Sequence, residues 1–253
     1  LPGPSLQGYS FPDLDAVFTP AWEEDVHRAI DEQQDHFLVV CSGLGLFERS
    51  WALRGFADAL MDTVDHPDFY DELIERLTDH QLDIVERLLE LPVDGILFSD
   101  DWGYQQGVLI GAGRWRKFFK RRLARLYQRV HAAGKYVLTH CCGGIEEILP
   151  DLIEIGLDVY QSVQPEPRNN DPYGLKRKYG DQIAFWGGLG SQSTIPFGTP
   201  DQIRAEVARL CREMGRGGGY ILAPAKPLQP GTPMENAAAV LEAFLQQAGV
   251  GFP

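Results

Sequence analysis

One histidine and two cysteines stand together at His140, Cys141 and Cys142. An imidazole and a thiolate two positions apart can turn toward one point, and a nitrogen and sulfur pair suits zinc. A catalytic zinc normally has three protein ligands, and Asp100 or Asp101 could supply an oxygen. Alternatively, Cys141 is a small buried residue and His140 only forms hydrogen bonds. The triplet therefore indicates either a metal site or a packed polar corner.

Two adjacent acids and one lysine are further candidates for chemistry. Asp100 and Asp101 follow an apolar run; either could cap the next loop or act as an acid, a base or a metal ligand. Lys226 could hold a substrate carboxylate, or could be an exposed lysine in a proline-rich loop. We predict Asp100, Asp101 and Lys226 as catalytic residues. The predicted metal ligands are His140, Cys142 and Asp100.

The elements that position these residues follow from hydrophobic patterning. Short apolar runs alternate with longer amphipathic stretches, which is typical of repeated β-α units around a parallel sheet. The predicted strands cover residues 36–42, 93–99, 135–140, 158–163, 183–187 and 219–223. The carboxyl ends of parallel strands meet at one rim, so residues after each strand should converge there. At this rim we predict five substrate-binding residues: Trp102, Gln161, Gln164, Trp186 and Gln192.

Helices are predicted from apolar residues three or four positions apart. One stripe contains Phe69, Leu73, Leu77, Ile84 and Leu88, and another contains Trp115, Phe118, Leu123, Leu126 and Val130. The basic run between positions 114 and 129 reads as a solvated helix face, with a contact to a protein or cofactor as the alternative. Thr-Pro pairs at 199–200 and 232–233 each predict an N-cap threonine followed by proline at the first helical position. Residues 1–35 read as an irregular lead-in with an acidic helix near 20–34, before a single domain.

Composition excludes several classes of protein. The 253 residues contain 36 acidic and 23 basic side chains, a formal net charge of −13, which argues against binding to nucleic acid or an anionic membrane. No apolar run is long enough to cross a bilayer. The opening Leu1-Pro-Gly-Pro-Ser has no secretory pattern and no initiator methionine, which suggests a trimmed start. Four irregularly spaced cysteines favour a reducing compartment, so we expect a soluble, cytoplasmic protein.

Several stretches in order resemble the uroporphyrinogen decarboxylase superfamily. They are Val93–Gly103, His140–Gly144, Ile148–Asp158, Phe185–Gly188, Gly218–Pro224 and Pro233–Asn236. The similarity runs from about residue 36 to the end. It implies a (β/α)8 TIM-barrel fold, whereas only about six β-α units are visible; the barrel is therefore expected to lack its N-terminal segment.

Two activities are implied by this resemblance. One is decarboxylation of porphyrinogens without a cofactor, and the other is zinc-dependent methyl transfer involving corrinoids. The methyltransferases hold zinc through a His-x-Cys pair, matched here by His140 and Cys142, and a third Cys in the last loop. That loop here contains Lys226 and no cysteine, so an acid at 100 or 101 would have to complete the site.

The leading hypothesis is metal-assisted methyl transfer with a small-molecule substrate, zinc as the cofactor and a corrinoid protein as partner; no nucleotide cofactor is indicated. A decarboxylase is the first alternative, with Asp100 or Asp101 stabilising a protonated intermediate and Lys226 holding a carboxylate. The net charge of −13 fits a polyanionic porphyrinogen poorly. A binding protein without turnover is the second alternative, and a homodimer is left open.

Overall fold

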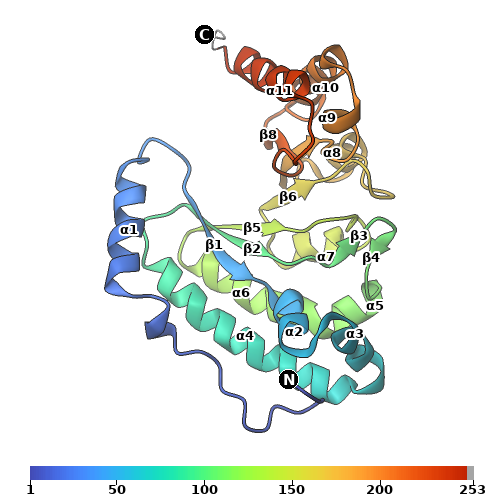
Figure 1. Ribbon diagram of the computed structural model, residues 1–253. Coiled ribbons are helices and arrows are strands. Elements are labelled where there is room, and N and C mark those ends of the chain that lie inside the picture. The colour runs from blue at the N-terminus through green and yellow to red at the C-terminus, as the bar shows by residue number, and fades with distance from the viewer. Residues whose placement is uncertain (250–253) are drawn as a thin grey trace. The chain divides into compact units, whose positions relative to one another are not determined.

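The computed structural model describes residues 1–249, and its larger sheet has six parallel strands (Figure 1). Its strand order is β1-β2-β5-β6-β7-β8. The strands are β1 (Val39–Leu44), β2 (Gly95–Ser99), β5 (Tyr136–His140), β6 (Val159–Val163), β7 (Ala184–Leu189) and β8 (Tyr220–Pro224). All six predicted strands are confirmed. The pattern did not predict the short antiparallel hairpin of β3 (Gly103–Tyr104) and β4 (Gly107–Val108).

Internal contacts group the chain into two compact units. The first contains residues 1–101, 110–139 and 154–157, and the second contains 102–109, 140–153 and 158 onward. Strands β1, β2 and nearly all of β5 belong to the first unit, while β3, β4, β6, β7 and β8 belong to the second. A single barrel-like domain stays a prediction.

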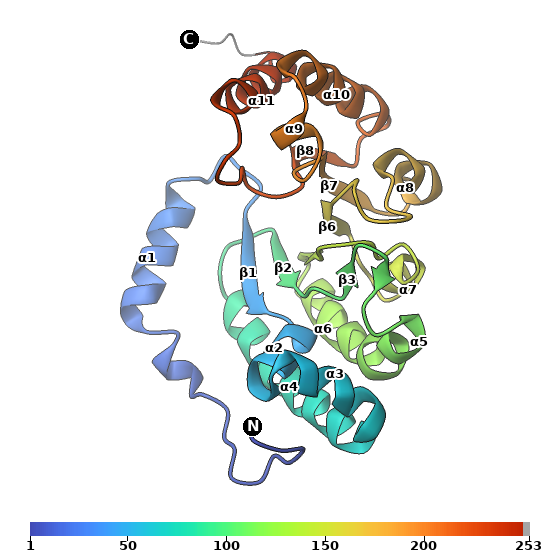
Figure 2. The same cartoon turned by 45° about the vertical axis from the view of Figure 1, so that its right-hand side comes forward.

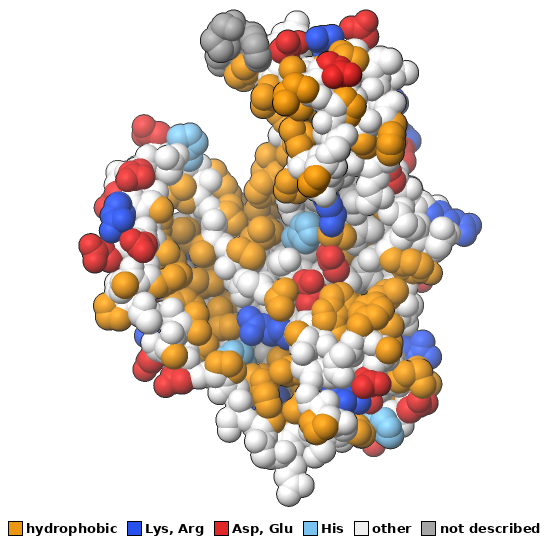
Figure 3. All heavy atoms as spheres, in the orientation of Figure 1, with side chains coloured by type: hydrophobic (Ala, Val, Ile, Leu, Met, Phe, Trp, Pro, Cys, Tyr) orange, Lys and Arg blue, Asp and Glu red, His pale blue; other side chains and the backbone are white. Residues whose placement is uncertain are grey.

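The first unit contains six α-helices among the described residues. They are α1 (Pro20–Asp31), α2 (Leu46–Arg54), α3 (Phe56–Asp65), α4 (Pro67–Leu89), α5 (Ala112–Trp115) and α6 (Arg121–Ala132). The predicted apolar stripes lie on α4 and on the stretch from α5 to α6. Four of the five predicted stripe residues of α4 are buried, namely Leu73, Leu77, Ile84 and Leu88. Helix α1 fits the predicted acidic helix near 20–34, and acidic and basic side chains lie together over it (Figure 3).

A π-helical turn at Arg116–Lys120 connects α5 to α6. The predicted stripe has a five-residue step between Phe118 and Leu123, which a regular α-helix would place on different faces. Both side chains are nonetheless buried, with Trp115 before them fully buried as well. The wider turn therefore brings the two parts of the stripe to the same core.

Ion pairs join α6 to α4, which lie side by side (Figures 1 and 2). Arg122 is only 3% exposed; its Nη1 lies 2.9 Å from Asp71 and its Nε lies 2.8 Å from Glu75. Arg125 contacts Glu75 and Asp79, at 2.5 and 2.8 Å. The prediction of a solvated face is wrong for Arg122, because carboxylates of α4, rather than water, contact its guanidinium group.

Helices of the second unit begin at caps that only partly match the prediction. They are α7 (Leu149–Glu154, with its last residue in the first unit), α8 (Pro172–Tyr179), α9 (Thr194–Phe197), α10 (Pro200–Glu213) and α11 (Met234–Gln247). Thr199 caps α10 in a complete capping box with Gln202, as predicted. The Thr232 cap is wrong: α11 starts at Met234, and the Thr232 hydroxyl donates to the Gln229 carbonyl instead.

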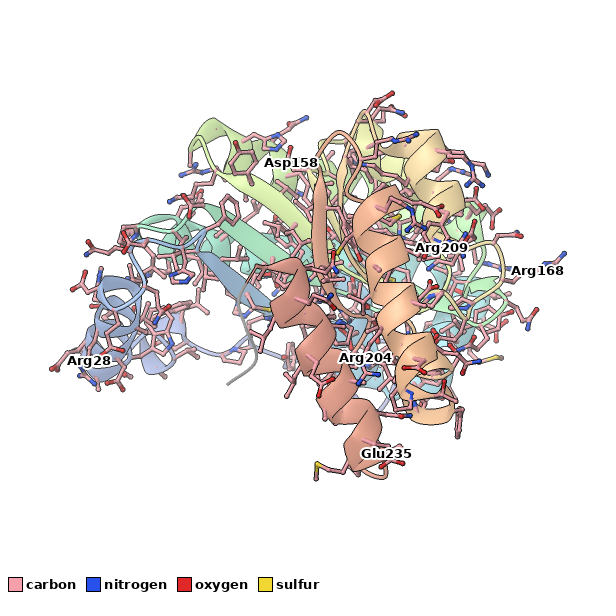
Figure 4. The ribbon with its side chains drawn as sticks, turned by 90° about the horizontal axis from the view of Figure 1, so that it is seen from above. Arg28, Asp158, Arg168, Arg204, Arg209 and Glu235 are labelled. Carbon is pink, nitrogen blue, oxygen red and sulfur yellow. The ribbon has the colours of Figure 1, made fainter. Side chains whose placement is uncertain are left out.

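Helices α10 and α11 lie side by side (Figures 2 and 4). Arg204 of α10, labelled in Figure 4, makes an ion pair with Glu242 of α11 at 2.7 Å. The Asn236 amide donates to the carbonyls of Ile195 and Gly198, at 2.8 and 2.9 Å, and so ties α11 to α9. Within residues 1–249, none of the helices combines the length and the apolar character that a membrane span requires.

Candidate metal and substrate site

Strand β5 ends at His140, and the chain leaves it as Cys141-Cys142-Gly143-Gly144. The His140 Nε2 atom lies 3.2 Å from the Cys142 Sγ atom. Cys141 is fully buried, whereas His140 and Cys142 are partly exposed. The structure therefore brings together one nitrogen and one sulfur donor, and directs the intervening cysteine into the interior.

Gln161 of β6 fixes the orientation of this imidazole. Its Oε1 atom is hydrogen-bonded to His140 Nδ1. The other ring nitrogen, Nε2, faces Cys142. Because an amide oxygen only accepts, the proton of the neutral imidazole resides on Nδ1, and the Nε2 lone pair points toward the sulfur. Metal-binding histidines are commonly held in this way by an acceptor on their second nitrogen.

The backbone after Cys142 is held by close contacts with the β3–β4 hairpin. Gly143 has a φ of +79°, and a Cβ atom there would lie 2.4 Å from the Tyr104 nitrogen. At Gly103 a Cβ atom would lie 2.5 Å from the Cys142 carbonyl oxygen. Gly144 N donates to Tyr104 O at 3.1 Å. Glycine is therefore required at both crossing points, where the two backbones touch.

Gln164 supports the same turn from the end of β6. Its Oε1 atom accepts from Gly143 N at 2.6 Å, and its own carbonyl accepts from Asn170 Nδ2, also at 2.6 Å. Its side chain is 1% exposed. We predicted a substrate contact for Gln164; in this structure its side chain positions the loop that carries Cys142.

A pocket of about 480 Å³ opens beside His140. Its lining consists of His140, Gln161, Pro224, Ala225, Lys226 and Pro227. One imidazole, one amide and one amine thus share a cavity whose other walls are apolar and small. This is the composition expected of a small-molecule site, with few polar groups that set orientation.

Asp100 is occupied by the start of helix α2. Its two carboxylate oxygens accept from Phe47 N and Glu48 N, each at 2.9 Å, and the residue is 1% exposed. A Cβ atom on Gly45 would lie 2.4 Å from the Asp100 Cγ, so glycine is required for this approach. Of the alternatives for the acidic pair, capping describes Asp100.

Comparisons with known proteins agree with the topology and the motifs. The family described as Uroporphyrinogen decarboxylase (URO-D) matches residues 50–246, more than half of the chain. The chain belongs to the uroporphyrinogen decarboxylase family.

Relatives within the uroporphyrinogen decarboxylase family carry two different activities. The Methylcobamide:CoM methyltransferase MtaA of Methanosarcina barkeri is 25% identical over 181 residues, covering 72% of this chain and 50% of that protein. The uroporphyrinogen decarboxylase of Coxiella burnetii is 23% identical over 250 residues, covering 91% of this chain and 66% of that protein. The chain thus spans about half the length of the first of these relatives, and both are enzymes.

A solved structure described as a methyltransferase from Methanosarcina mazei has the same fold. It superposes with a TM-score of 0.75 at 21% identity, covering 96% of this chain and 69% of that one. This similarity confirms the TIM-barrel-like fold class that the family resemblance implied.

Trp102, Trp186 and Gln192, three further predicted site residues, are not among the residues that line the pocket beside His140. Trp102, which belongs to the second unit, is 1% exposed. Trp186 of β7 is the register partner of Gln161 on β6 and is partly exposed. Gln192 accepts from Gln105 Nε2 at 3.0 Å and lines a separate pocket beside α9 and α10.

Sequence reasoning missed how the hairpin supports the site. Gly103 and Gly143 were not singled out, although their backbones touch behind Cys142. A signal was present in Gly103-Tyr-Gln-Gln-Gly107, because glycines on both sides of a short polar stretch are typical of a tight hairpin. What the sequence could not show is which loop this hairpin packs against.

Proposed function

We propose that this member of the uroporphyrinogen decarboxylase family catalyses metal-assisted methyl transfer. The observation that carries the proposal is the pairing of His140 Nε2 with Cys142 Sγ at 3.2 Å, with Gln161 on the opposite ring nitrogen. A proton held on Nδ1 places the lone pair on Nε2, the nitrogen that faces the Cys142 sulfur. The donor chemistry therefore fits zinc.

We assign the third ligand to Asp101 rather than to Asp100. Both oxygens of Asp100 already accept hydrogen bonds from the first amides of α2. Asp101 is the other acid of the pair. Together Asp101, His140 and Cys142 offer oxygen, nitrogen and sulfur, a donor set that suits zinc.

The family relatives suggest the reactants, a methylcobamide as donor and the thiol CoM as acceptor. Bound zinc would lower the pKa of a thiol and so raise the fraction of the reactive thiolate. In the transfer the carbon–sulfur bond forms, the carbon–cobalt bond breaks with its electron pair left on cobalt, and the thiol proton passes to solvent. A corrinoid protein would supply the donor in the cell.

Residues of the pocket have separate roles in this proposal. Gln161 keeps the His140 proton on Nδ1, and the small Ala225 leaves room for a ligand beside the imidazole. Lys226 provides a positive charge that attracts an anionic group of the substrate.

Metal content tests the proposal directly. Protein purified without added metal should contain about one zinc per chain, and His140→Ala, Cys142→Ser and Asp101→Asn should each lose most of it. Cys211→Ser, which changes a cysteine of α10 away from the pocket, is the matched control and should keep its zinc. Absence of zinc from the parent protein, or full retention in Cys142→Ser, would contradict the assignment.

Activity is the second measurement. Methylcobamide and CoM should yield methylated CoM, and Cys142→Ser should lower the rate at least about a hundredfold, since a metal ligand is lost. A protein that binds zinc through His140 and Cys142 but forms no methylated thiol would retain the metal site and refute the methyl transfer.

Decarboxylation is the second candidate, favoured by the presence of Lys226 in the same pocket as His140. An ammonium group there could hold a substrate carboxylate, and uroporphyrinogen decarboxylases are among the relatives. This activity predicts that carbon dioxide is released from uroporphyrinogen. The rate of release should be lower in Lys226→Met and unchanged by chelators. If no carbon dioxide is released, the decarboxylation hypothesis is refuted.

A further inference from the structure

A second pocket lies entirely within the first unit and shares no residue with the candidate metal site. It has a volume of about 300 Å³ and lies between the N-terminal segment 12–22, the end of β1, α2 and the second half of α4. Its apolar walls come from Pro12, Leu14, Val17, Phe18, Trp22, Ile84 and Leu88. In the space-filling view, hydrophobic side chains gather between α1 and α2, beside a basic and a histidine side chain (Figure 3).

Arg49 places a positive charge among the apolar walls of this pocket. Its Nε donates to Leu44 O at 2.7 Å, and no carboxylate of residues 1–249 comes within 4.0 Å of its guanidinium. Burial lowers the pKa of Arg49, against an opposing effect from the charge of Asp100. The oxygens of Asp100 are held by the amides of α2, so they leave the guanidinium edge available to a ligand.

His80 is the second polar group of the pocket. It is 8% exposed, and in the described chain neither ring nitrogen has a hydrogen-bond partner. The Phe11 ring stacks on the imidazole with centroids 4.9 Å apart. Burial and the nearby charge of Arg49 lower the pKa of His80, with Asp83 acting in the opposite direction. The neutral ring therefore has one N–H to donate and one nitrogen that can accept.

We infer that this pocket binds an organic acid with a compact apolar body, its carboxylate on Arg49 and His80 and its body against Leu14, Phe18, Trp22 and Ile84. A carboxylate matches the two parallel N–H groups of a guanidinium and also accepts from an imidazole N–H. The apolar walls remove the rest of the molecule from water. The ligand therefore has to combine one anionic end with a hydrocarbon or aromatic end.

Straight-chain carboxylates of increasing length test both halves of this inference. Calorimetric titration of the purified chain with acetate, butanoate, hexanoate and octanoate should show affinity rising by about fourfold for each added CH₂ until the pocket is full. Octan-1-ol, which has the same number of carbon atoms without the charge, should bind at least about tenfold more weakly than octanoate. Equal affinity for the alcohol and the acid, no rise with chain length, or no binding of octanoate would each overturn the inference.

Three variants locate the binding. Arg49→Met should remove the preference for octanoate over octan-1-ol, and Val17→Trp should block both probes by filling the pocket. Val17 is 53% exposed, so the larger ring can be accommodated without unfolding the unit. Arg28→Met is the matched control, because Arg28 lies on the outer part of α1, outside the lining, and changes the same charge (Figure 4).

The control should bind octanoate as the parent does. Melting temperatures of all three variants show that each is folded. Octanoate binding unchanged in Arg49→Met or in Val17→Trp would place the ligand elsewhere and refute this site. None of these residues lines the pocket beside His140, so zinc content should be the same in all variants.

Discussion

Gln161 and His140 are hydrogen-bonded between the Gln161 amide oxygen and the imidazole Nδ1 atom, on two strands that follow one another in the sheet order. The amide decides which ring nitrogen carries the proton, although it lies outside the proposed ligand set. We expect Gln161→Leu to fold normally and to bind zinc about 10- to 100-fold more weakly, as when other partners of metal-binding histidines are removed.

Competition with a zinc chelator measures this effect. Gln192→Leu is the control, because Gln192 is exposed and contacts Gln105 rather than His140. An unchanged zinc affinity in Gln161→Leu would show that the imidazole is oriented without the amide.

Backbone contact at Gly143 predicts a large stability cost for a single methyl group. Gly143→Ala combines a positive φ with a Cβ atom 2.4 Å from Tyr104 N. Gly217→Ala is a matched control, since Gly217 has a φ of +76° and no atom lies within 4 Å of the position that its Cβ would take. We expect about 1 kcal/mol of destabilisation for Gly217→Ala and at least about 2 kcal/mol more for Gly143→Ala, from urea unfolding. Equal costs would mean that the hairpin moves away easily.

Burial of Arg122 predicts that its charge stabilises the first unit. Arg122→Met should lower the free energy of unfolding by about 1–3 kcal/mol, because four acceptor atoms, on Asp71, Glu75 and Phe118, lose a charged donor. Arg121→Met, at a side chain 78% exposed with one acidic partner at 3.4 Å, should change it by less than about 0.5 kcal/mol. Similar losses in both variants would contradict a role for burial.

Acidification should weaken the same contact. The hydrogen bond from Arg122 holds the pKa of Asp71 below its usual value. The contribution of Asp71 to stability is therefore fully present above about pH 4, and is lost as the pH falls through the lower pKa of the folded state. Asp71→Asn should show a smaller loss of stability than the parent protein between about pH 5 and pH 2 in thermal unfolding. Identical pH profiles would show that Asp71 is not a contributor.

Two threonines that look alike in sequence should differ in their stabilising effect. Thr199→Ala removes the capping box of α10 and should cost about 1 kcal/mol. Thr232→Ala removes only a hydroxyl that donates to Gln229 in a turn, and should cost less than half as much. Chemical unfolding measures the loss of stability in both variants. A larger loss in Thr232→Ala than in Thr199→Ala would contradict this account of the helix starts.

The contrast between Thr199 and Thr232 shows what could be predicted from the sequence. Hydrophobic patterning located all six strands, because burial of apolar side chains is encoded locally along each strand. The start of α11 was predicted one residue too early, since the Thr232 hydroxyl had a carbonyl of its own turn within reach.

The candidate site was predictable in its residue types but not in their roles. The pairing of His140 with Cys142 could be expected from a two-residue spacing at a strand end. The capping role of Asp100 depends on Phe47 and Glu48, which lie more than fifty positions earlier in the chain. Similarly, the buried state of Arg122 depends on acids of another helix. Such roles come from partners distant in sequence, which a local pattern does not contain.

The π-helical turn between α5 and α6 has a consequence for insertions and deletions. A regular α-helix advances by about 100° per residue, so Trp115 and Leu123, eight positions apart, would lie about 80° apart around an unbroken α-helix. Removing one residue between 116 and 120 would leave seven positions, and a regular α-helix would then bring the two side chains to within about 20° of each other. The π turn therefore takes up one extra residue, and the chain should tolerate a deletion here better than a further insertion.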